Sequence, residues 1–310
     1  MMGFLLFPND KKMYPRLIVL IIVLIQGTIS HSQTKDEIDF HEMDAARELL
    51  DNGNFESGLK IIDSVLQVNP ENPYAWQMKG NVYANHFKDY RQAIDFYKKH
   101  EEIYPDNALN LANIGKNFFK IDSIGQGKEY ISRAYQLDPN NEYIINQYAY
   151  YIIEKVEEKI WWYKNALLVS KLKENLGYQL HKSTQGEIYN NIGYYLYLNQ
   201  SFVESSVYLL NGLEFGSDDP ELLNNLGNSL QRINYLDAAL IYYDKALKIE
   251  PSKVFSLNGK ANTFLKLNQI DSACVYWQKA LDNGYIFKEE WRDIWNIEDP
   301  KVQLAKFCKE

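Results

Sequence analysis

An internal repeat with a period close to 34 residues constrains this chain more than any other feature of its sequence. Prolines that follow helix-like runs lie at Pro70, Pro105 and Pro139, which are successively 35 and 34 residues apart. Small residues continue the interval at Gly193, Gly227 and Ala261, which are successively 34 residues apart. A fixed period of this length is typical of repeat proteins, in which each unit packs only against its neighbours.

Each unit of the repeat predicts two amphipathic helices, as residues 220–251 show. Apolar or small side chains recur at helical spacing in two successive segments, Leu223, Leu226, Gly227 and Leu230, then Ala239, Tyr243 and Ala246. Asp219 followed by Pro220 predicts the start of the first helix, because Asp caps free N–H groups and Pro lacks one. Asn234 interrupts the pattern and predicts the turn between the helices.

The small residues of a unit have a packing reason, because two helices approach closely only where the side chains between them are small. We therefore expect Gly227 on the first helix to lie against Ala239 on the second. Ala246 is expected to contact the first helix of the next unit. One hairpin cannot bury both of its faces, so the units must stack.

The recurring residues resemble the tetratricopeptide repeat family, whose pattern combines Leu-Gly, aromatic, Ala and Pro positions. In the first half of the chain the matching residues are Ala46, Leu49, Gly58, Ile62, Val65 and Pro70, then Trp76, Gly80, Tyr83, Ala93, Tyr97 and Pro105, then Leu111, Ile114, Gly115, Phe118, Gly127, Ile131, Ala134 and Pro139. In the second half, besides residues 220–251, they are Tyr189, Ile192, Gly193, Leu196, Ser205, Leu209 and Gly212, then Leu257, Ala261, Phe264, Ala273, Trp277 and Ala280. The resemblance covers most of residues 39–285, with one extra residue in the turn of residues 73–105. It implies an all-α fold, a right-handed superhelical solenoid of antiparallel helix pairs, and a non-catalytic function in binding other proteins.

The N-terminus looks like a secretory signal peptide of a bacterial kind. Lys11, Lys12 and Arg16 precede the apolar run from Leu17 to Ile25, and small residues up to Ser32 follow it. We expect cleavage after Ser32, which places the mature chain in the periplasm, in the cell envelope or outside the cell. The apolar run is shorter than the ~20 residues of a bilayer span. An uncleaved membrane anchor is the alternative, and Met13 is an alternative start.

The repeat pattern and its lapses predict the domain organisation. After the signal peptide (residues 1–32), residues 33–140 hold the first three repeats, and residues 186–285 hold the later ones. Residues 141–185 depart from the pattern, with Lys159 where a small residue is expected, and predict an irregular helical pair plus a short helix or loop around Gly177 and Gln179. In residues 286–310, Phe287, Trp291, Ile294 and Trp295 share a helical face and predict a cap on the last repeat. A partner-binding tail is the alternative for this segment.

Charge and cysteine content exclude some classes of function. The formal net charge of −8 and the lack of a basic stripe argue against nucleic acid as a partner. Cys274 and Cys308 are too few for a disulfide framework, and we interpret them as small, partly buried apolar residues, with a single bridge in an oxidising compartment left open.

The sequence carries no motif that indicates catalysis, a cofactor or a metal. The histidines are scattered, and His41 with Glu42 and Asp44 lacks the spacing of a ligand set on a helix. Adjacent carboxylates such as Glu157 and Glu158 point apart on a helix. We therefore expect no enzyme, no cofactor and no metal.

The resemblance also implies where a partner would bind, because the first helices of successive units line a groove in this family. The residues expected to face a peptide or protein there are Gln77, Asn81, Asn113, Lys116, Asn190, Tyr194, Asn224, Asn228, Asn258 and Asn262. Asparagine amides both donate to and accept from an extended backbone. The alternative role for these asparagines is to brace adjacent repeats.

Two other functions stay open at this point. Residues 141–185 could form an enzyme pocket around Glu154, Glu157, Lys159 and His181. Alternatively, Trp161 and Trp162 could stack against cell-wall glycan. The sequence names neither the partner nor the oligomeric state.

Overall fold

The structure of the chain is a computed structural model that describes residues 37–178, 182–216, 218–295 and 297–308. Every secondary-structure element in these ranges is helical, and none of them is a strand. Nor does any helix among the described residues have the length and apolar character needed to cross a membrane. The predicted signal peptide lies outside the described residues. The chain divides into two compact units, Met1–Pro105 and Asp106–Glu310.

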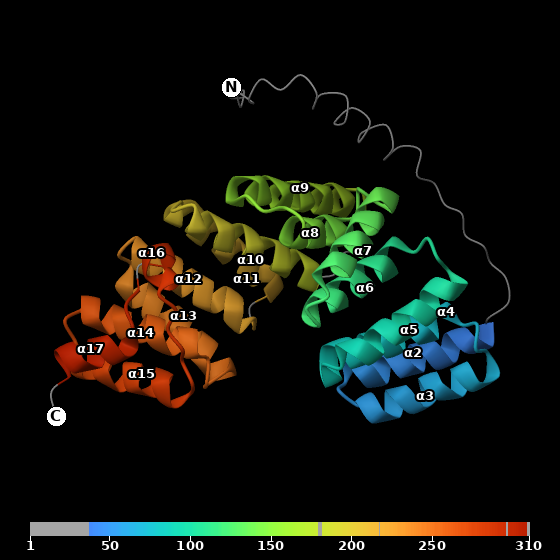
Figure 1. The fold of residues 1–310 in the computed structure, drawn as a ribbon, viewed down its shortest axis with the longest axis horizontal. Coiled ribbons are helices and arrows are strands. Elements are labelled where there is room, and N and C mark those ends of the chain that lie inside the picture. Colours follow the sequence, from blue (N-terminus) through green and yellow to red (C-terminus); the bar gives the residue numbers. More distant parts are fainter. Residues whose placement is uncertain (1–36, 179–181, 217, 296, 309–310) are drawn as a thin grey trace, which may run out of the picture. The chain divides into compact units, whose positions relative to one another are not determined.

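The first unit contains two helix pairs (Figure 1). They are α2 (Glu37–Asp51) with α3 (Phe55–Val68), and α4 (Pro73–Val82) with α5 (Tyr90–Ile103). Residues from α2, α3 and α4 share one apolar core, formed by Met43, Ala46, Ile62, Val65, Leu66 and Ala75. The core thus joins one pair to the next, as stacking requires.

The described part of the second unit contains five helix pairs and two short C-terminal helices. The pairs are α6 (Ala108–Lys120) with α7 (Ile124–Leu137), α8 (Glu142–Tyr151) with α9 (Val156–Asn175), α10 (Lys182–Leu198) with α11 (Phe202–Gly216), α12 (Pro220–Arg232) with α13 (Leu236–Ile249), and α14 (Val254–Lys266) with α15 (Ile270–Asp282). The short helices are α16 (Glu290–Trp295) and α17 (Pro300–Phe307). The first helix α12 also packs against the first helices α10 and α14, so the exposed faces of the three form a common surface. The predicted all-helical array of paired helices is confirmed.

The helix start predicted at Asp219 is confirmed. The Asp219 carboxylate accepts a hydrogen bond from the Glu221 N–H at 2.8 Å, and Pro220 occupies the first helical position. Asparagine has the same capping role before α4, α6 and α8, through Asn72, Asn107 and Asn141. Short polar residues therefore fix where the first helices of several pairs begin.

The turn inside most pairs depends on one residue with a left-handed backbone. Asp122, Gln200, Asn234 and Asn268 occupy this position in the second unit, with φ between 59° and 65°. The N–H of the following residue then reaches back across the last helical turn, as from Tyr235 to the Leu230 carbonyl at 2.9 Å. The turn predicted at Asn234 is confirmed.

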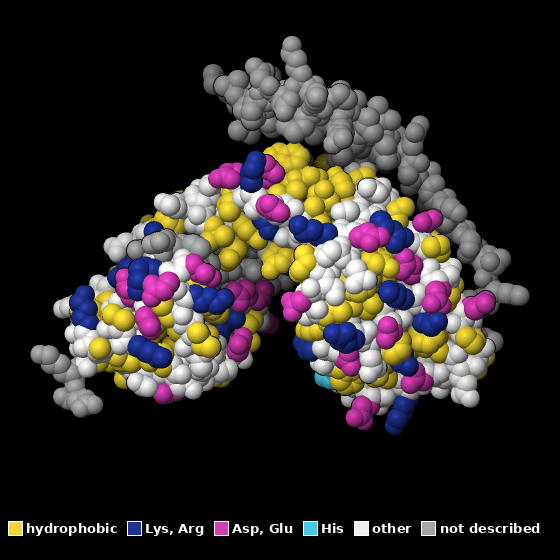
Figure 2. Space-filling model, viewed as in Figure 1, with side chains coloured by type: hydrophobic (Ala, Val, Ile, Leu, Met, Phe, Trp, Pro, Cys, Tyr) yellow, Lys and Arg dark blue, Asp and Glu magenta, His cyan; other side chains and the backbone are white. Residues whose placement is uncertain are grey.

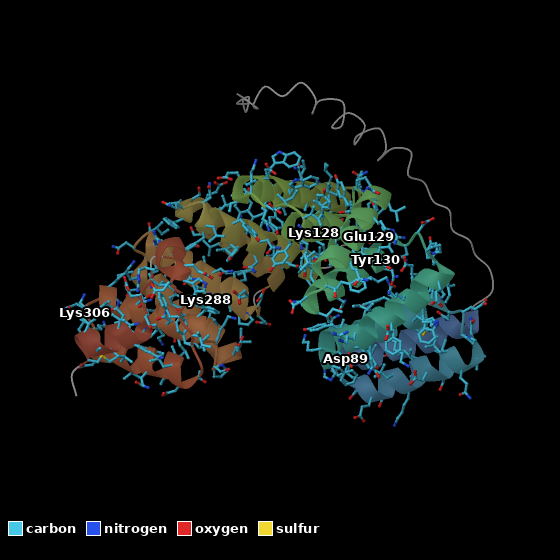
Figure 3. The ribbon with its side chains drawn as sticks, viewed as in Figure 1. Asp89, Lys128, Glu129, Tyr130, Lys288 and Lys306 are labelled. Carbon is cyan, nitrogen blue, oxygen red and sulfur yellow. A yellow bond between two sulfur atoms is a disulfide. The ribbon has the colours of Figure 1, made fainter. Side chains whose placement is uncertain are left out.

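The extra residue in the turn of residues 73–105 is absorbed by a π-helical turn, η1 (Tyr83–Phe87), at the end of α4. Lys88 is left-handed with φ of 57°, and the Asp89 N–H bonds to the Tyr83 carbonyl, one residue further back than elsewhere. Asp89, labelled in Figure 3, then caps α5 by accepting from the Gln92 N–H at 3.1 Å. The added residue widens one helical turn and leaves the pair intact.

The repeated glycines lie where the two helices of a pair cross, but the side chain they accommodate was not the predicted one. A Cβ on Gly227 would lie 2.7 Å from the ring of Tyr243, which is therefore the nearest neighbour in place of Ala239. Gly259 of the next pair meets the same ring, at 2.6 Å. Glycine is needed here because an aromatic ring, larger than alanine, fills the crossing.

The irregular stretch 141–185 is a helical pair with a long second helix. α8 has 10 residues and α9 has 20, and Gly177 with φ of 84° follows the end of α9. Among the described residues, α9 ends in a turn at Leu176 and Gly177, and no separate short helix lies before α10. Gln179 and His181 lie outside the described residues.

The C-terminal helix α17 packs on the last pair (Figure 1). Its Leu304 and Phe307 contact a core of Ala261, Ala273 and Trp277. Cys308, at the end of α17, forms a disulfide with Cys274 of α15, with the two Cα atoms 5.9 Å apart. The single bridge that the sequence left open is therefore formed, in place of the two small apolar residues that we favoured. Their pairing depends on α17 folding back onto α15, which the sequence pattern does not reveal.

Candidate binding site

The second unit contains a cavity of about 490 Å³ on the common surface of α10, α12 and α14. Three groups of residues line it: asparagine and glutamine amides, aromatic rings, and residues from the segment that follows the last pair. They are Tyr194, Tyr197, Leu198, Glu221, Asn224, Asn225, Asn228, Gln231, Phe255, Asn258, Gly259, Asn262, Glu290, Trp291 and Ile297.

The cavity brings together half of the residues predicted to face a partner. Tyr194, Asn224, Asn228, Asn258 and Asn262 all line it. These five residues come from three helix pairs that are consecutive in the chain, so the repeat period places them on one surface.

The other predicted residues lie elsewhere. Asn190 accepts a hydrogen bond from the Asn225 amide at 3.0 Å and so supports the cavity from outside its lining. The Asn113 side chain accepts from the Tyr143 hydroxyl at 2.9 Å, and Lys116 lies half-buried on α6. Gln77 and Asn81 belong to α4 of the first unit.

The amide orientation of Asn262 follows from its partner. The indole Nε1 of Trp277 lies 3.0 Å from Asn262 Oδ1, and an indole nitrogen can only donate. The contacting atom must therefore be the amide oxygen, which leaves both N–H groups of Asn262 on the other side of the amide. Asn228 has the same arrangement, because its oxygen accepts from the Tyr243 hydroxyl at 2.8 Å. In each case the second helix of the pair fixes the oxygen.

Other asparagines brace neighbouring first helices, as the alternative interpretation expected. The Asn224 oxygen accepts from the Ser256 hydroxyl at 3.0 Å, which joins α12 to α14. Asn191 donates to Asn146 at 2.9 Å, which joins α10 to α8. The fold thus uses one end of several amides, and contact of the other end with a peptide stays a prediction.

Asn258 has an unmet acceptor in the cavity wall. Its amide nitrogen donates to the Tyr285 hydroxyl at 3.2 Å, whereas its oxygen has no hydrogen-bond partner among the described residues. The side chain is only 3% exposed. A buried acceptor without a partner is unfavourable by roughly 1–3 kcal/mol.

Aromatic rings form the apolar part of the cavity wall. Phe255, Tyr285 and Trp291 contact one another in one cluster, with Phe255 and Trp291 centroids 5.5 Å apart. Lys288, labelled in Figure 3, lies 5.5 Å from the centre of the Trp291 ring. Burial raises the pKa of Tyr285 to about 12, helped by the nearby Asp299, so this hydroxyl stays neutral at physiological pH.

The charged groups of the cavity lining are two carboxylates. Glu221 forms an ion pair with Lys253 at 2.8 Å, and Glu290 is exposed. Burial opposes the charge of Lys253, but its ion pairs with Glu221 and Glu250 outweigh burial and raise its pKa. The lining therefore has an acidic side at Glu290.

The structure does not assemble the enzyme pocket considered for residues 141–185. The Lys159 ammonium donates to the Tyr150 carbonyl at 2.7 Å and to the Tyr195 hydroxyl at 3.2 Å, away from a carboxylate pair. Glu154 instead lies 3.8 Å from Lys128. His181 lies outside the described residues. The proposed set of catalytic groups is thus not brought together among the described residues.

The tryptophan pair considered for glycan binding is split between surface and core. Trp162 packs against the rings of Tyr135 and Tyr148, whereas Trp161 is 45% exposed. Figure 2 shows apolar side chains gathered over the region of α9. One exposed ring gives a smaller stacking surface than the two that were expected.

Sequence reasoning missed three important residues of the cavity: Asn225, Phe255 and Trp291. Asn225 immediately precedes a Leu-Gly pair, so its place on the common surface could have been found from the period. Phe255 lies near the start of α14, and the repeat period could have placed it on the common surface in the same way. Trp291 was noted as part of a cap, but its position depends on where the segment after α15 lies.

Comparisons with known proteins agree with this fold. Residues 43–108 and residues 220–253 match family models described as tetratricopeptide repeat, and neither model is that of an enzyme. The two matched segments therefore hold tetratricopeptide repeats, within an all-helical array of paired helices of the same kind. Among curated proteins, no sequence matches it.

Solved structures with a similar fold include other helical repeat proteins. The crystal structure of the APC/C hetero-tetramer Cut9–Hcn1 matches with a TM-score of 0.66 and 15% identity, over 83% of this chain and 50% of that chain. PilF of Pseudomonas aeruginosa matches with a TM-score of 0.54 and 16% identity, over 76% of this chain and 96% of PilF. PilW, a type IV pilus biogenesis factor, matches with a TM-score of 0.56 and 16% identity, over 72% of this chain and 97% of PilW. This chain spans half the length of the first of these, and at such identities the likeness shows the fold alone.

Proposed function

We propose that this chain is a non-catalytic interaction protein that binds a segment of another polypeptide in the cavity of α10, α12 and α14. The observation that carries the proposal is the orientation of the Asn228 and Asn262 amides, whose oxygens are held by the second helices of their pairs. Their N–H groups are then left to meet the carbonyls of an extended backbone. Tetratricopeptide repeats typically mediate protein–protein interactions, which supports the same conclusion.

A photo-crosslinking residue at Tyr194, in the cavity lining, tests this function in the native cell. We expect it to form covalent adducts with a protein partner that mass spectrometry then identifies. Val275 is the matched control position, because it is half-exposed on α15 and outside the lining. Identical adducts from both positions, or none from Tyr194, would contradict the proposed site.

We also propose that the chain works in an oxidising compartment after export. Two features support this location: the signal-like residues 11–32 and the disulfide between Cys274 and Cys308. Disulfides persist in exported proteins and are rare in the reducing cytosol. An uncleaved N-terminal anchor is an alternative that would keep the repeats in the same compartment.

Thiol labelling in intact cells tests the location. We expect a maleimide mass tag to react with the chain only after reduction, and the mature N-terminus to begin at Gln33. Free thiols before reduction would argue against export, and an intact N-terminus with protected thiols would indicate the anchored form. Replacing both cysteines with serine should lower the free energy of unfolding by about 3–4 kcal/mol, since the bond closes a loop of 34 residues.

A further inference from the structure

The cavity is closed on one side by residues that do not belong to any repeat. Glu290, Trp291 and Ile297 come from the segment between α15 and α17, and they line the cavity together with helices α10, α12 and α14. The Trp291 ring is held against Phe255 and Tyr285, with centroids 5.5 and 6.2 Å away. The surface of the three first helices is thus walled at this point and does not continue as an open groove.

We propose that this walled cavity captures one bulky apolar side chain, aromatic or long aliphatic, of a partner polypeptide, and that Trp291 sets this selectivity. The inference rests on the proposed function and narrows it from any peptide segment to one with an apolar anchor residue. The partner segment is neutral or basic around that anchor.

The size of the cavity favours an anchor residue. A volume of about 490 Å³ falls in the range of pockets that enclose a compact ligand. Such a volume holds one large side chain with the backbone on either side of it. Phe255, which is 44% exposed, and Trp291 offer an aromatic surface for that side chain. Buried aromatic contacts of this kind dominate the affinity of many interfaces.

The polar part of the lining suits the backbone next to the anchor. The amide oxygens of Asn262 and Asn228 are already bonded, and their N–H groups, which form no hydrogen bond among the described residues, can donate to carbonyl oxygens. Amide donors therefore occur together with the apolar wall.

The charge of the lining selects against acidic neighbours of the anchor. Glu290 is exposed, and Glu221 shares its partner Lys253 with Glu250. A carboxylate on the partner would be repelled by Glu290, whereas a lysine or arginine would be attracted.

Selection from a displayed library of random peptides on the purified, oxidised chain tests the inference. We expect the enriched peptides to share one aromatic or long aliphatic position and to lack Asp and Glu beside it. Synthetic copies should bind the Trp291→Ala variant about tenfold to a hundredfold more weakly, as for a central aromatic contact. The Trp161→Ala variant, which removes an exposed tryptophan of α9, is the matched control and should bind as the native chain does.

The outcomes separate this inference from the function on which it rests. Enriched peptides that bind Trp291→Ala and the native chain equally would overturn the anchor site while leaving peptide binding intact. A selection that enriches no peptide would overturn both. Because Trp291→Ala could disturb α16, the Phe255→Ala variant tests the same wall from α14 and should lose affinity by a similar factor. Circular dichroism of each variant shows whether the helices are retained.

Discussion

The helix pairs α12–α13 and α8–α9 each bury a tyrosine of their second helix, but the two tyrosine hydroxyls have different surroundings. Tyr243 of α13 and Tyr163 of α9 are both fully buried. The Tyr243 ring lies against Gly227, and its hydroxyl donates to Asn228 at 2.8 Å. The Tyr163 ring stacks on Tyr195 with centroids 5.5 Å apart, and its hydroxyl lies near the Tyr195 hydroxyl without forming a hydrogen bond of standard geometry among the described residues. The regular repeat thus supplies both space and a polar partner, whereas the irregular pair supplies only space.

A second difference lies one helical turn earlier, where α13 has Ala239 and α9 has Lys159. Ala239 is fully buried, and Lys159 extends to the Tyr150 carbonyl in the last turn of α8. Such terminal carbonyls have no partner within their own helix. A lysine is tolerated here because the shorter α8 ends early and needs a donor. The comparison teaches that this fold accepts a break in its pattern if the new side chain meets an unsatisfied group.

Exchanging the two residues gives the largest expected contrast. Ala239→Lys would bury an ammonium without a partner and should lower the free energy of unfolding by about 4 kcal/mol. Lys159→Ala removes two hydrogen bonds and should lower it by only about 1–2 kcal/mol. Denaturant unfolding of both variants measures the difference. Equal losses would mean that the two crossings tolerate a lysine alike.

The glycine at the regular crossing gives the next largest effect. Gly227→Val should lower the free energy of unfolding by about 3 kcal/mol, because its side chain would overlap the Tyr243 ring. Gly125→Ala is the matched control, since a Cβ on this exposed glycine of α7 has no neighbour within 4 Å. We expect no loss of stability there. A mild effect at Gly227 would show that the ring shifts easily and that the crossing is loosely packed.

Removing the two buried tyrosine hydroxyls should give a smaller difference in the free energy of unfolding between the two pairs. Tyr243→Phe loses the bond to Asn228 and should lower the free energy of unfolding by about 1 kcal/mol. Tyr163→Phe removes a hydroxyl that has no partner among the described residues and should leave stability unchanged or slightly raised. Thermal and denaturant unfolding distinguish the two. A clear loss at Tyr163 would reveal a bond that forms in solution.

The pH dependence of stability gives the smallest contrast. Burial lowers the pKa of Lys159 from its usual value of 10.5, so the folded chain binds fewer protons at this site than the unfolded chain. Its contribution to the free energy of unfolding is therefore reduced below the lowered pKa and recovers as pH rises toward 10.5. Lys159→Met should flatten this rise, whereas Lys164→Met, which removes a lysine of α9 that pairs with Glu204, should keep it. A rise that survives Lys159→Met would assign it to another group.

The period of the sequence could predict the helix pairs, the start of α12 at Asp219 and the turn at Asn234, because caps and turns are local. It also placed five residues of the cavity on one surface, because equivalent positions of stacked pairs must be neighbours. The ring against Gly227 was missed, since spacing gives the site of a crossing but not the side chain that fills it. Trp291 was missed and the disulfide was only left open, because both depend on where a segment outside the repeats folds back.

The bond between Cys274 and Cys308 has a mechanical consequence. Tension applied to the chain beyond Cys308 passes through the two sulfur atoms directly into α15. The residues between the two cysteines, which include α16 and α17, are bypassed by this force. A force applied at this end would therefore act on the helix pairs before it could separate the segment around Trp291 from the cavity.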